Sequence, residues 1–157
     1  MRDPGDPALD GLHLCAWLVL ERADGRILLG RRSGVHYGEG LWGLPGGHAE
    51  AAESWVAAAV RETREEVGVD VRPGDLEPVG VQRYRDGDAH GVDVIFRTRR
   101  WSGTPAAVSE CSEVGWFAPG ELPADSLDWL ADVLAQHLTR GEWFGEQGFP
   151  AAAEEDT

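Results

Sequence analysis

Three glutamates lie close enough along the chain for one helical turn to gather them. At about 100° per residue, Glu65 falls about 60° to one side of Glu62 and Glu66 about 40° to the other. A separate, mostly apolar stripe can dock on a sheet and consists of Val56, Val60, Thr63 and Val67. Carboxylates held this close destabilise a helix unless a cation lies among them. Mg²⁺ prefers oxygen ligands, so the spacing indicates a metal site.

A solvated acidic face on an ordinary amphipathic helix would also explain the glutamates taken alone. The flanking residues favour the metal site. The segment Pro45–Gly47 is a loop that allows close backbone approach, and Glu53 follows its last residue by six positions. Arg61 and Glu62 come eight and nine positions later, and Gly68 is placed to cap the end of the helix.

This pattern resembles the Nudix box, Gly-x5-Glu-x7-Arg-Glu-U-x-Glu-Glu-x-Gly-U, in which U is aliphatic. The matching positions are Gly47, Glu53, Arg61, Glu62, Glu65, Glu66, Gly68 and Val69. Thr63 departs from the first U, although its methyl group can still pack, and Ala52 stands where many members carry glycine. The resemblance extends from about Leu12 to Phe149 and implies an α/β/α sandwich with the box as a loop–helix–loop against a mixed sheet.

The resemblance also implies roles for the box residues. Nudix enzymes hold Mg²⁺ or Mn²⁺ with the carboxylates that here are Glu62, Glu65 and Glu66. A loop carbonyl that often joins these ligands would belong to Gly46. Glu53 resembles a supporting residue that fixes the box, and Arg61 resembles its structural partner. Such a metal site suits hydrolysis of a phosphoanhydride, in which negative charge is neutralised and a water is oriented.

Many Nudix enzymes take a further ligand or general base from a later strand or loop. Glu113 is the candidate here, because the segment from Ser112 to Phe117 resembles the acidic and aromatic segment of nucleotide-sanitising members. Glu110 is the second choice. The alternative for Glu113 is an exposed charge at a strand edge.

Substrate contacts are predicted from the arginines at the end of the second strand and from two later residues. Arg32 is the better candidate for the phosphate tail, because Arg31 would point to the opposite face of the strand. Both could instead be solvated. Trp42 could stack on a ligand or belong to the core, and Asp125 could bind a base edge or cap a helix. Gly43 replaces the base-binding asparagine of oxidised-purine enzymes.

Three functions remain open. The first is hydrolysis of nucleoside triphosphates to a monophosphate and pyrophosphate. The second is hydrolysis of ADP-ribose or a nucleotide sugar, and the third is ligand binding by a non-catalytic Nudix domain. The intact carboxylates disfavour the third. The ADP-ribose enzymes often carry a proline in the region that here is Val81–Tyr84, and its absence favours the first.

The chain has 157 residues, enough for one domain with a substantial core. Its net charge of −14 argues against a nucleic-acid polymer as partner, whereas a small phosphate ester can bind where metal ions screen the site. Two cysteines form no disulfide framework, and the longest apolar run, Leu14–Leu20, is too short to span a membrane. We therefore expect a cytoplasmic protein. The oligomeric state stays open.

The predicted domain covers residues 12–149, between a flexible arm at 1–11 and a disordered tail at 150–157. A hairpin through Ala23–Gly25 joins the first two strands, and a helix runs from Asp125 or Ser126 to about Arg140. His90 lies in a polar turn, more typical of a solvated than a catalytic histidine. The predicted strands are Leu12–Glu21, Arg26–Arg32, Val69–Val71, Leu76–Arg85, Val92–Arg100, Glu113–Phe117 and a final strand within Gly141–Phe149.

Overall fold

A computed structural model of the chain describes residues 11–153. Nearly all of the arm predicted at 1–11 and the end of the tail predicted at 150–157 therefore lie outside the described residues. Residues 150–153 are exposed and form neither helix nor strand.

The larger of two sheets has five strands in the order β4-β1-β6-β5-β8. Their bounds are Leu12–Leu20 for β1, Gly46–His48 for β4, Glu77–Asp86 for β5, Ala89–Thr98 for β6 and Phe144–Gln147 for β8. β1 runs parallel to β6 and antiparallel to β4, while β5 runs antiparallel to β6 and parallel to β8. The sheet is mixed, as predicted, and β8 is the predicted final strand.

The smaller sheet is antiparallel, in the order β3-β2-β7. Its strands are β2 (Ile27–Arg32), β3 (Trp42–Gly43) and β7 (Cys111–Phe117). The turn predicted at Ala23–Gly25 forms, with the Arg22 amide donating to the Arg26 carbonyl oxygen at 2.8 Å. The hairpin goes no further than one antiparallel bridge, from Glu21 to Ile27, because β1 and β2 lie in different sheets. Both edges of β1 are already paired, with β4 and β6, so β2 has no edge of β1 to join.

The box helix is α1 (Trp55–Val67), and both of its ends are capped. The Ser54 hydroxyl accepts a hydrogen bond from the Ala57 amide at 3.0 Å, and Gly68 adopts the left-handed conformation, with φ of 73°, that the sequence predicted for it. The side chains it buries are Ala58, Ala59, Thr63 and Val67, whereas Val56 and Val60 are only partly buried. Ala58, Ala59 and Val67 pack on one face of the five-stranded sheet, in a cluster with Ala16, Leu18 and Val94.

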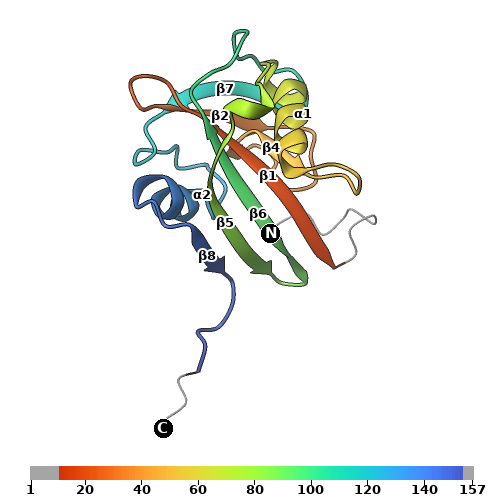
Figure 1. Cartoon of the computed structure of the whole chain (residues 1–157), viewed down its shortest axis with the longest axis vertical. Helices are drawn as coiled ribbons and strands as arrows, with labels where there is room; N and C mark the ends of the chain where they lie inside the picture. The colour runs from red at the N-terminus through yellow and green to blue at the C-terminus, as the bar shows by residue number, and fades with distance from the viewer. Residues whose placement is uncertain (1–10, 154–157) are drawn as a thin grey trace.

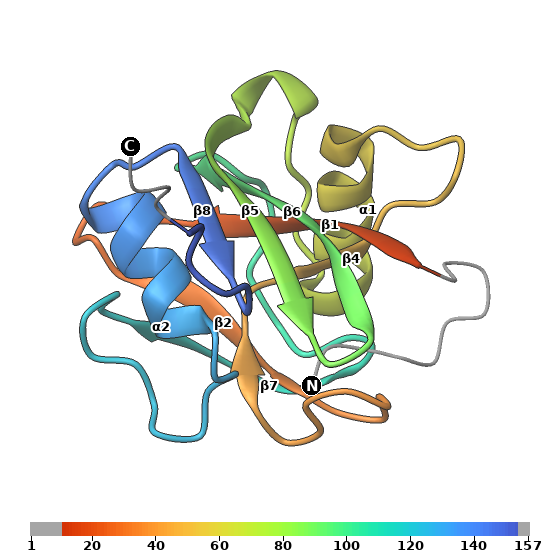
Figure 2. The same cartoon turned by 90° about the horizontal axis from the view of Figure 1, so that it is seen from below.

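The opposite face of this sheet is covered by α2 (Leu130–Val133), which continues as the π-helix η3 (Leu134–Thr139). Leu130 and Leu134 pack there against Trp17 and Ile95. Figure 1 and Figure 2 show α1 and α2 on opposite sides of the long strands β1, β5 and β6. The layers are those of the predicted α/β/α sandwich.

The predicted start of the last helix, at Asp125 or Ser126, is wrong. The backbone there pairs with β3 instead, since Trp42 donates its amide hydrogen to Asp125 at 2.9 Å and accepts one from Leu127 at 2.9 Å. The helix begins only at Leu130, with Trp129 as the residue before it.

Two further local predictions are corrected. Val69–Val71 forms a single bridge, between Asp70 and Ser102, rather than a strand, although both valines are buried. β6 begins earlier than predicted, so His90 lies within it rather than in a turn and contacts Arg83 Nη2 at 3.1 Å. Between these, Pro73–Asp75 forms the short 3-10 helix η2. Nowhere in residues 11–153 does a helix combine the length and hydropathy needed to cross a membrane.

Candidate functional site

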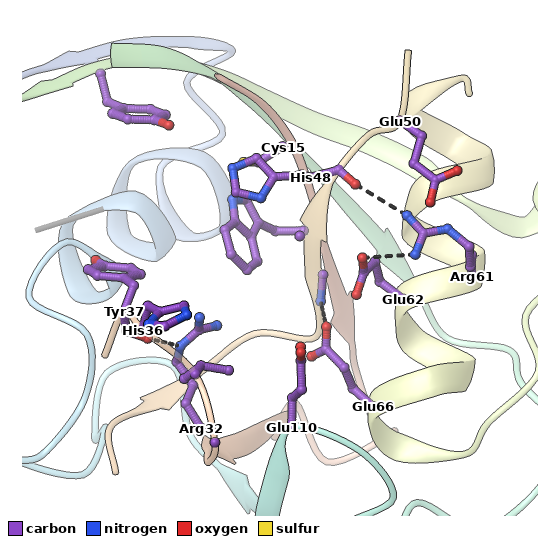
Figure 3. A pocket seen from close by; sticks show the side chains of 16 residues that line it. Cys15, Arg32, His36, Tyr37, His48, Glu50, Arg61, Glu62, Glu66 and Glu110 are labelled. Atoms are coloured by element: carbon purple, nitrogen blue, oxygen red, sulfur yellow. Dashed lines mark hydrogen bonds and ion pairs between the residues drawn. The ribbon is translucent and has the colours of Figure 1, made fainter. Parts of the chain in front are cut away.

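A cavity of about 460 Å³ opens between α1, β1, β4 and the loop that follows β2 (Figure 3). Its two halves differ in chemistry. The side formed by α1 is the charged half and carries the box charges Arg61, Glu62 and Glu66, with Glu110 beside Glu66. The rest of the wall carries aromatic and imidazole groups, namely Trp17, His36, Tyr37, His48 and Tyr84, together with Arg32, which lies beside Tyr37 opposite α1. The sequence therefore places ring systems beside a strongly charged wall.

Glu62 and Glu66 form the centre of the charged half. They lie one helical turn apart, and burial is the main cause that raises the pKa of each carboxyl group. The pKa of Glu66 lies well above its usual range, because the carboxyl of Glu62 adds a hydrogen bond and a like charge to the effect of burial. Burial and like charge therefore both disfavour the ionised pair, and a metal cation bound between the carboxylates would offset that cost.

The backbone of the box loop comes directly against these carboxylates. The Gly46 amide donates to Glu66 Oε1 at 3.4 Å, and a Cβ on Gly47 would lie 3.2 Å from the Glu62 carboxyl carbon. Gly46 has φ of 146°, and a Cβ there would collide with the carbonyl oxygen of Ala16. Pairing of β4 with β1 imposes this close approach, so only glycine fits.

Arg61 joins the loop to the helix. Its Nε and Nη2 donate to the two oxygens of Glu53 at 2.8 and 3.0 Å, and its Nη1 donates to Glu62 at 3.0 Å and to Glu65 at 3.2 Å. Nη2 also reaches the carbonyl oxygen of His48 at 3.2 Å. These hydrogen bonds lower the pKa of Glu53 and raise that of Arg61. One guanidinium thus holds three carboxylates in register with the loop.

We expect Arg61→Met to destabilise the protein by about 1–3 kcal/mol, because three partly shielded carboxylates lose their counter-charge. Glu53 has a lowered folded-state pKa, so its share of this stability is present above its unfolded pKa of about 4.3 and is lost as pH falls through the folded value. Urea denaturation at pH 7 and at pH 3 measures both effects.

The matched control is Arg64→Met, on the same helix. Arg64 is 66% exposed and pairs with the exposed Asp70, so its loss is expected to change stability by less than about 0.5 kcal/mol. Equal losses for the two variants would contradict the role given to Arg61.

The two arginines of β2 point to opposite faces, as the alternation of a strand predicts. Arg32 lines the cavity, and its positive charge acts to lower the pKa of Glu66. Arg31 lies on the other face, where it donates to Asp125 at 2.5 Å and faces Glu113 at 3.6 Å.

The structure brings together only part of the predicted site. Gly46, Glu62, Glu66 and Arg32 line the cavity, and Glu53 lies behind it on Arg61. Four predicted residues lie elsewhere. Glu65 is half-exposed on Arg61, and Trp42 is 6% exposed and packs edge-on against Phe117, while Glu113 and Asp125 bind Arg31.

Asp125 does not cap the last helix either, because that helix starts five residues later. Its nearest charged partner is Arg31, across the smaller sheet from the cavity. The base contact that the resemblance suggested for Asp125 is therefore not supported by its position, because Asp125 does not line the cavity.

Glu110, the second choice for the additional carboxylate, points into the cavity beside Glu66 (Figure 3). Its φ of 53° is left-handed, unusual for a residue with a side chain, and its carbonyl oxygen accepts from the Ser33 amide at 3.1 Å. No pattern in the sequence indicated that turn. His48, in contrast, directly follows the glycines of the box, so its place at the cavity could have been predicted from the spacing.

The donors in the charged half fit a hard divalent cation. The carboxylates of Glu62, Glu66 and Glu110 and the peptide oxygens of the box loop are all oxygen donors. No three histidine, cysteine, aspartate or glutamate side chains converge on a common metal position within residues 11–153. The fit thus rests on the chemistry of the oxygen donors and on the closeness of Glu62 and Glu66, whose carboxyl groups act on each other.

Known proteins resemble this chain over most of its length. The NUDIX domain matches residues 11–138. A MutT-like protein of Streptomyces ambofaciens is 34% identical over 120 residues, 76% of this chain and 70% of that protein. An ADP-ribose pyrophosphatase of Methanocaldococcus jannaschii is 30% identical over 110 residues, 70% of this chain and 64% of that protein. The crystal structure of a MutT NUDIX hydrolase from Burkholderia pseudomallei superposes with a TM-score of 0.70 at 28% identity, covering 80% of this chain and 97% of that one.

The chain therefore belongs to the NUDIX domain family, and the resemblance drawn from the box is confirmed. It is a hydrolase that acts on phosphoanhydride bonds.

Proposed function

We propose that the protein is a divalent-metal-dependent pyrophosphohydrolase that converts nucleoside triphosphates to a monophosphate and pyrophosphate. The observation that carries this proposal is the position of Glu66. Its carboxyl lies between Glu62 and the Gly46 amide, in a cavity whose far side holds Arg32. A phosphate chain bound between a carboxylate-held cation and a guanidinium would be neutralised from both sides.

Glu62 and Glu66, with the carbonyl of Gly46, would hold Mg²⁺ or Mn²⁺, and the predicted ligand Glu65 would have to leave Arg61 to join them. When bound, such an ion neutralises phosphate charge and lowers the pKa of a bound water. Arg32 would bind the phosphate tail, and Arg61 would keep the box carboxylates in place. The aromatic half of the cavity would exclude water from one side of the reaction and accept the nucleoside.

We assign the additional carboxylate to Glu110 rather than to the predicted Glu113. Glu110 faces the box carboxylates, whereas Glu113 is paired with Arg31. As a general base, Glu110 would accept the proton of the attacking water.

Glu110→Gln is expected to lower kcat by about 10- to 100-fold, because the amide cannot accept that proton. Glu113→Gln is the matched control, since it lies three residues away on β7 and outside the cavity, and its kcat is expected to stay within about threefold of wild type. A steady-state pH profile of both variants is the measurement. An unchanged profile for Glu110→Gln together with a loss in Glu113→Gln would return the assignment to Glu113.

Arg32→Ala is expected to raise KM for a triphosphate by about tenfold with little change in kcat, because a ground-state phosphate contact is lost. Arg31→Ala serves as control and is expected to leave KM within about twofold, since Arg31 is engaged with Asp125 and Glu113 on the other face. Initial rates over a range of nucleotide concentrations separate the two constants. The role of Arg32 is contradicted if both variants keep the wild-type KM.

Hydrolysis of ADP-ribose or a nucleotide sugar is the second candidate function. It is favoured by the similarity to the ADP-ribose pyrophosphatase of Methanocaldococcus jannaschii and by the several rings that line the cavity, including Trp17, Tyr37 and Tyr84. A panel of nucleoside triphosphates, ADP-ribose and nucleotide sugars, assayed with Mg²⁺, decides between the two. Reaction in ¹⁸O-labelled water then identifies the phosphorus that is attacked.

A small nucleotide as the bound partner and a cytoplasmic location belong to the same proposal. Cys15 is buried and Cys111 partly buried, and no disulfide joins them, so we place the protein in a reducing compartment.

A further inference from the structure

Tyr37 holds the guanidinium of Arg32 by two separate parts of the same residue. Its backbone carbonyl accepts a hydrogen bond from Arg32 Nε at 2.9 Å. The guanidinium carbon of Arg32 also lies 5.4 Å from the centre of the Tyr37 ring, a cation–π distance. Figure 3 shows Tyr37 and Arg32 together on the side of the cavity opposite α1.

Tyr37 is itself fixed from behind. Its hydroxyl accepts a hydrogen bond from Trp129 Nε1 at 3.0 Å. Trp129 is 6% exposed, immediately precedes α2, and packs against Trp17 with ring centres 5.3 Å apart. The ring of Tyr37 is thus anchored to the core on the α2 side of the sheet.

The loop that carries Tyr37 is closely packed as well. Gly38 has φ of 67°, and a Cβ there would lie 2.6 Å from Leu127 Cδ2 and 3.2 Å from Arg32 Nε. The Gly40 amide donates to the carbonyl oxygen of Arg32 at 2.8 Å. The loop therefore closes around the arginine and needs glycine where it does so.

The contacts that fix the Arg32 guanidinium matter because the carboxylates of the cavity also attract it. The positive charge of Arg32 acts to lower the pKa of Glu66, and Glu110 lines the same cavity. A free arginine side chain loses rotamer entropy when it binds a ligand. Fixing it beforehand lowers the cost of binding a phosphate and keeps the guanidinium apart from the proposed metal ligands.

We propose that Tyr37, locked by Trp129, is a positioning residue that sets Arg32 for the phosphate tail of the substrate. This inference rests on the proposed function, in which Arg32 binds phosphate. It adds a chain of contacts from the core through Trp129 and Tyr37 to that arginine. If Tyr37 instead stacked on the nucleobase, its variants would lose affinity for nucleotides but not for a phosphate ligand without a base.

The experiment measures binding of imidodiphosphate, a non-hydrolysable analogue of pyrophosphate without a base, by calorimetry in Mg²⁺ buffer. Tyr37→Phe and Trp129→Phe each break the same hydrogen bond and keep an aromatic ring. Each is expected to raise Kd by about threefold, and the double variant by no more than either alone, because one link is lost in all three. Tyr37→Ala is expected to raise Kd by about tenfold, close to the effect of Arg32→Ala.

Two controls accompany the binding experiment. Trp101→Phe changes a tryptophan stacked on Trp116 away from the cavity and is expected to leave Kd unchanged. Thermal unfolding of each variant identifies a protein that has lost its fold. At saturating nucleotide, Tyr37→Phe is expected to keep its kcat within about twofold, so that the change lies in KM.

The proposal is overturned if Tyr37→Ala binds imidodiphosphate as tightly as wild type while Arg32→Ala does not. It is also overturned if Tyr37 variants lose affinity for nucleotides only, since that result assigns Tyr37 to the base. Absence of nucleoside triphosphate hydrolysis by the wild type would instead overturn the proposed function, and the imidodiphosphate affinities would still test the positioning of Arg32.

Discussion

EDTA is expected to abolish hydrolysis by the wild-type protein, and added Mg²⁺ or Mn²⁺ is expected to restore it. The cavity opposes two clustered carboxylates, Glu62 and Glu66, to a substrate that is itself an anion. Only Arg32 and Arg61 bring positive side chains to the part of the cavity that the structure describes, and Arg61 is engaged by three glutamates. Without a further cation the phosphate chain would be repelled.

Release of phosphate or pyrophosphate, followed before chelation, after chelation and after metal is returned, is the measurement. Circular dichroism of the chelated protein serves as control, because a loss of fold would also remove activity. Full turnover in well-chelated buffer would contradict a metal-dependent reaction.

Glu66→Gln is expected to lower kcat by about 10² or more, because a contact to the metal-stabilised transition state is lost. The fold is expected to remain. Glutamine has nearly the same shape, and burial, which raises the pKa of Glu66, disfavours a charge at this position in the folded protein. Stability at pH 7, measured with urea, is therefore expected to stay the same or rise while activity falls.

Glu65→Gln is the matched comparison on the same helix turn. Glu65 is 53% exposed and accepts a hydrogen bond from Arg61 in the structure, so its loss is expected to cost less, about tenfold in kcat. Turnover of Glu66→Gln near the wild-type rate would remove Glu66 from the metal site.

The box could be predicted from the sequence because its determinants are local. Helix periodicity, the glycine at the end of α1 and the spacing from Gly46 to Val69 all act within one loop and one helix. The opposite orientations of Arg31 and Arg32 follow from strand alternation in the same way.

The errors arise where a partner distant in the sequence decides the structure. The turn predicted at Ala23–Gly25 forms, but β1 pairs in parallel with β6, some eighty residues away, instead of with β2, and no local pattern encodes that choice. The segment at Asp125 has a capping residue, but pairing with Trp42 keeps it out of the helix. At both segments tertiary contacts, rather than the local turn or capping propensity, decide how the backbone pairs.

The site was only partly predictable for the same reason. Whether Glu110 or Glu113 faces the cavity depends on the left-handed turn at Glu110 and on the register of β7 against β2. Neither the turn nor the register can be predicted from the composition or the spacing of the residues. Trp42 is hydrophobic enough to serve in a core or a ligand site, and its contact with Phe117 places it in the core.

Binding of Mn²⁺ to the protein without substrate tests the central claim most directly, since it examines the carboxylate cluster apart from turnover. Electron paramagnetic resonance of free Mn²⁺, titrated with wild-type protein and with Glu66→Gln, gives both affinities. We predict that wild type binds Mn²⁺, that Mg²⁺ displaces it, and that Glu66→Gln binds at least about tenfold more weakly. Equal affinities for the two proteins, or no binding by wild type, would contradict a metal site built on Glu66.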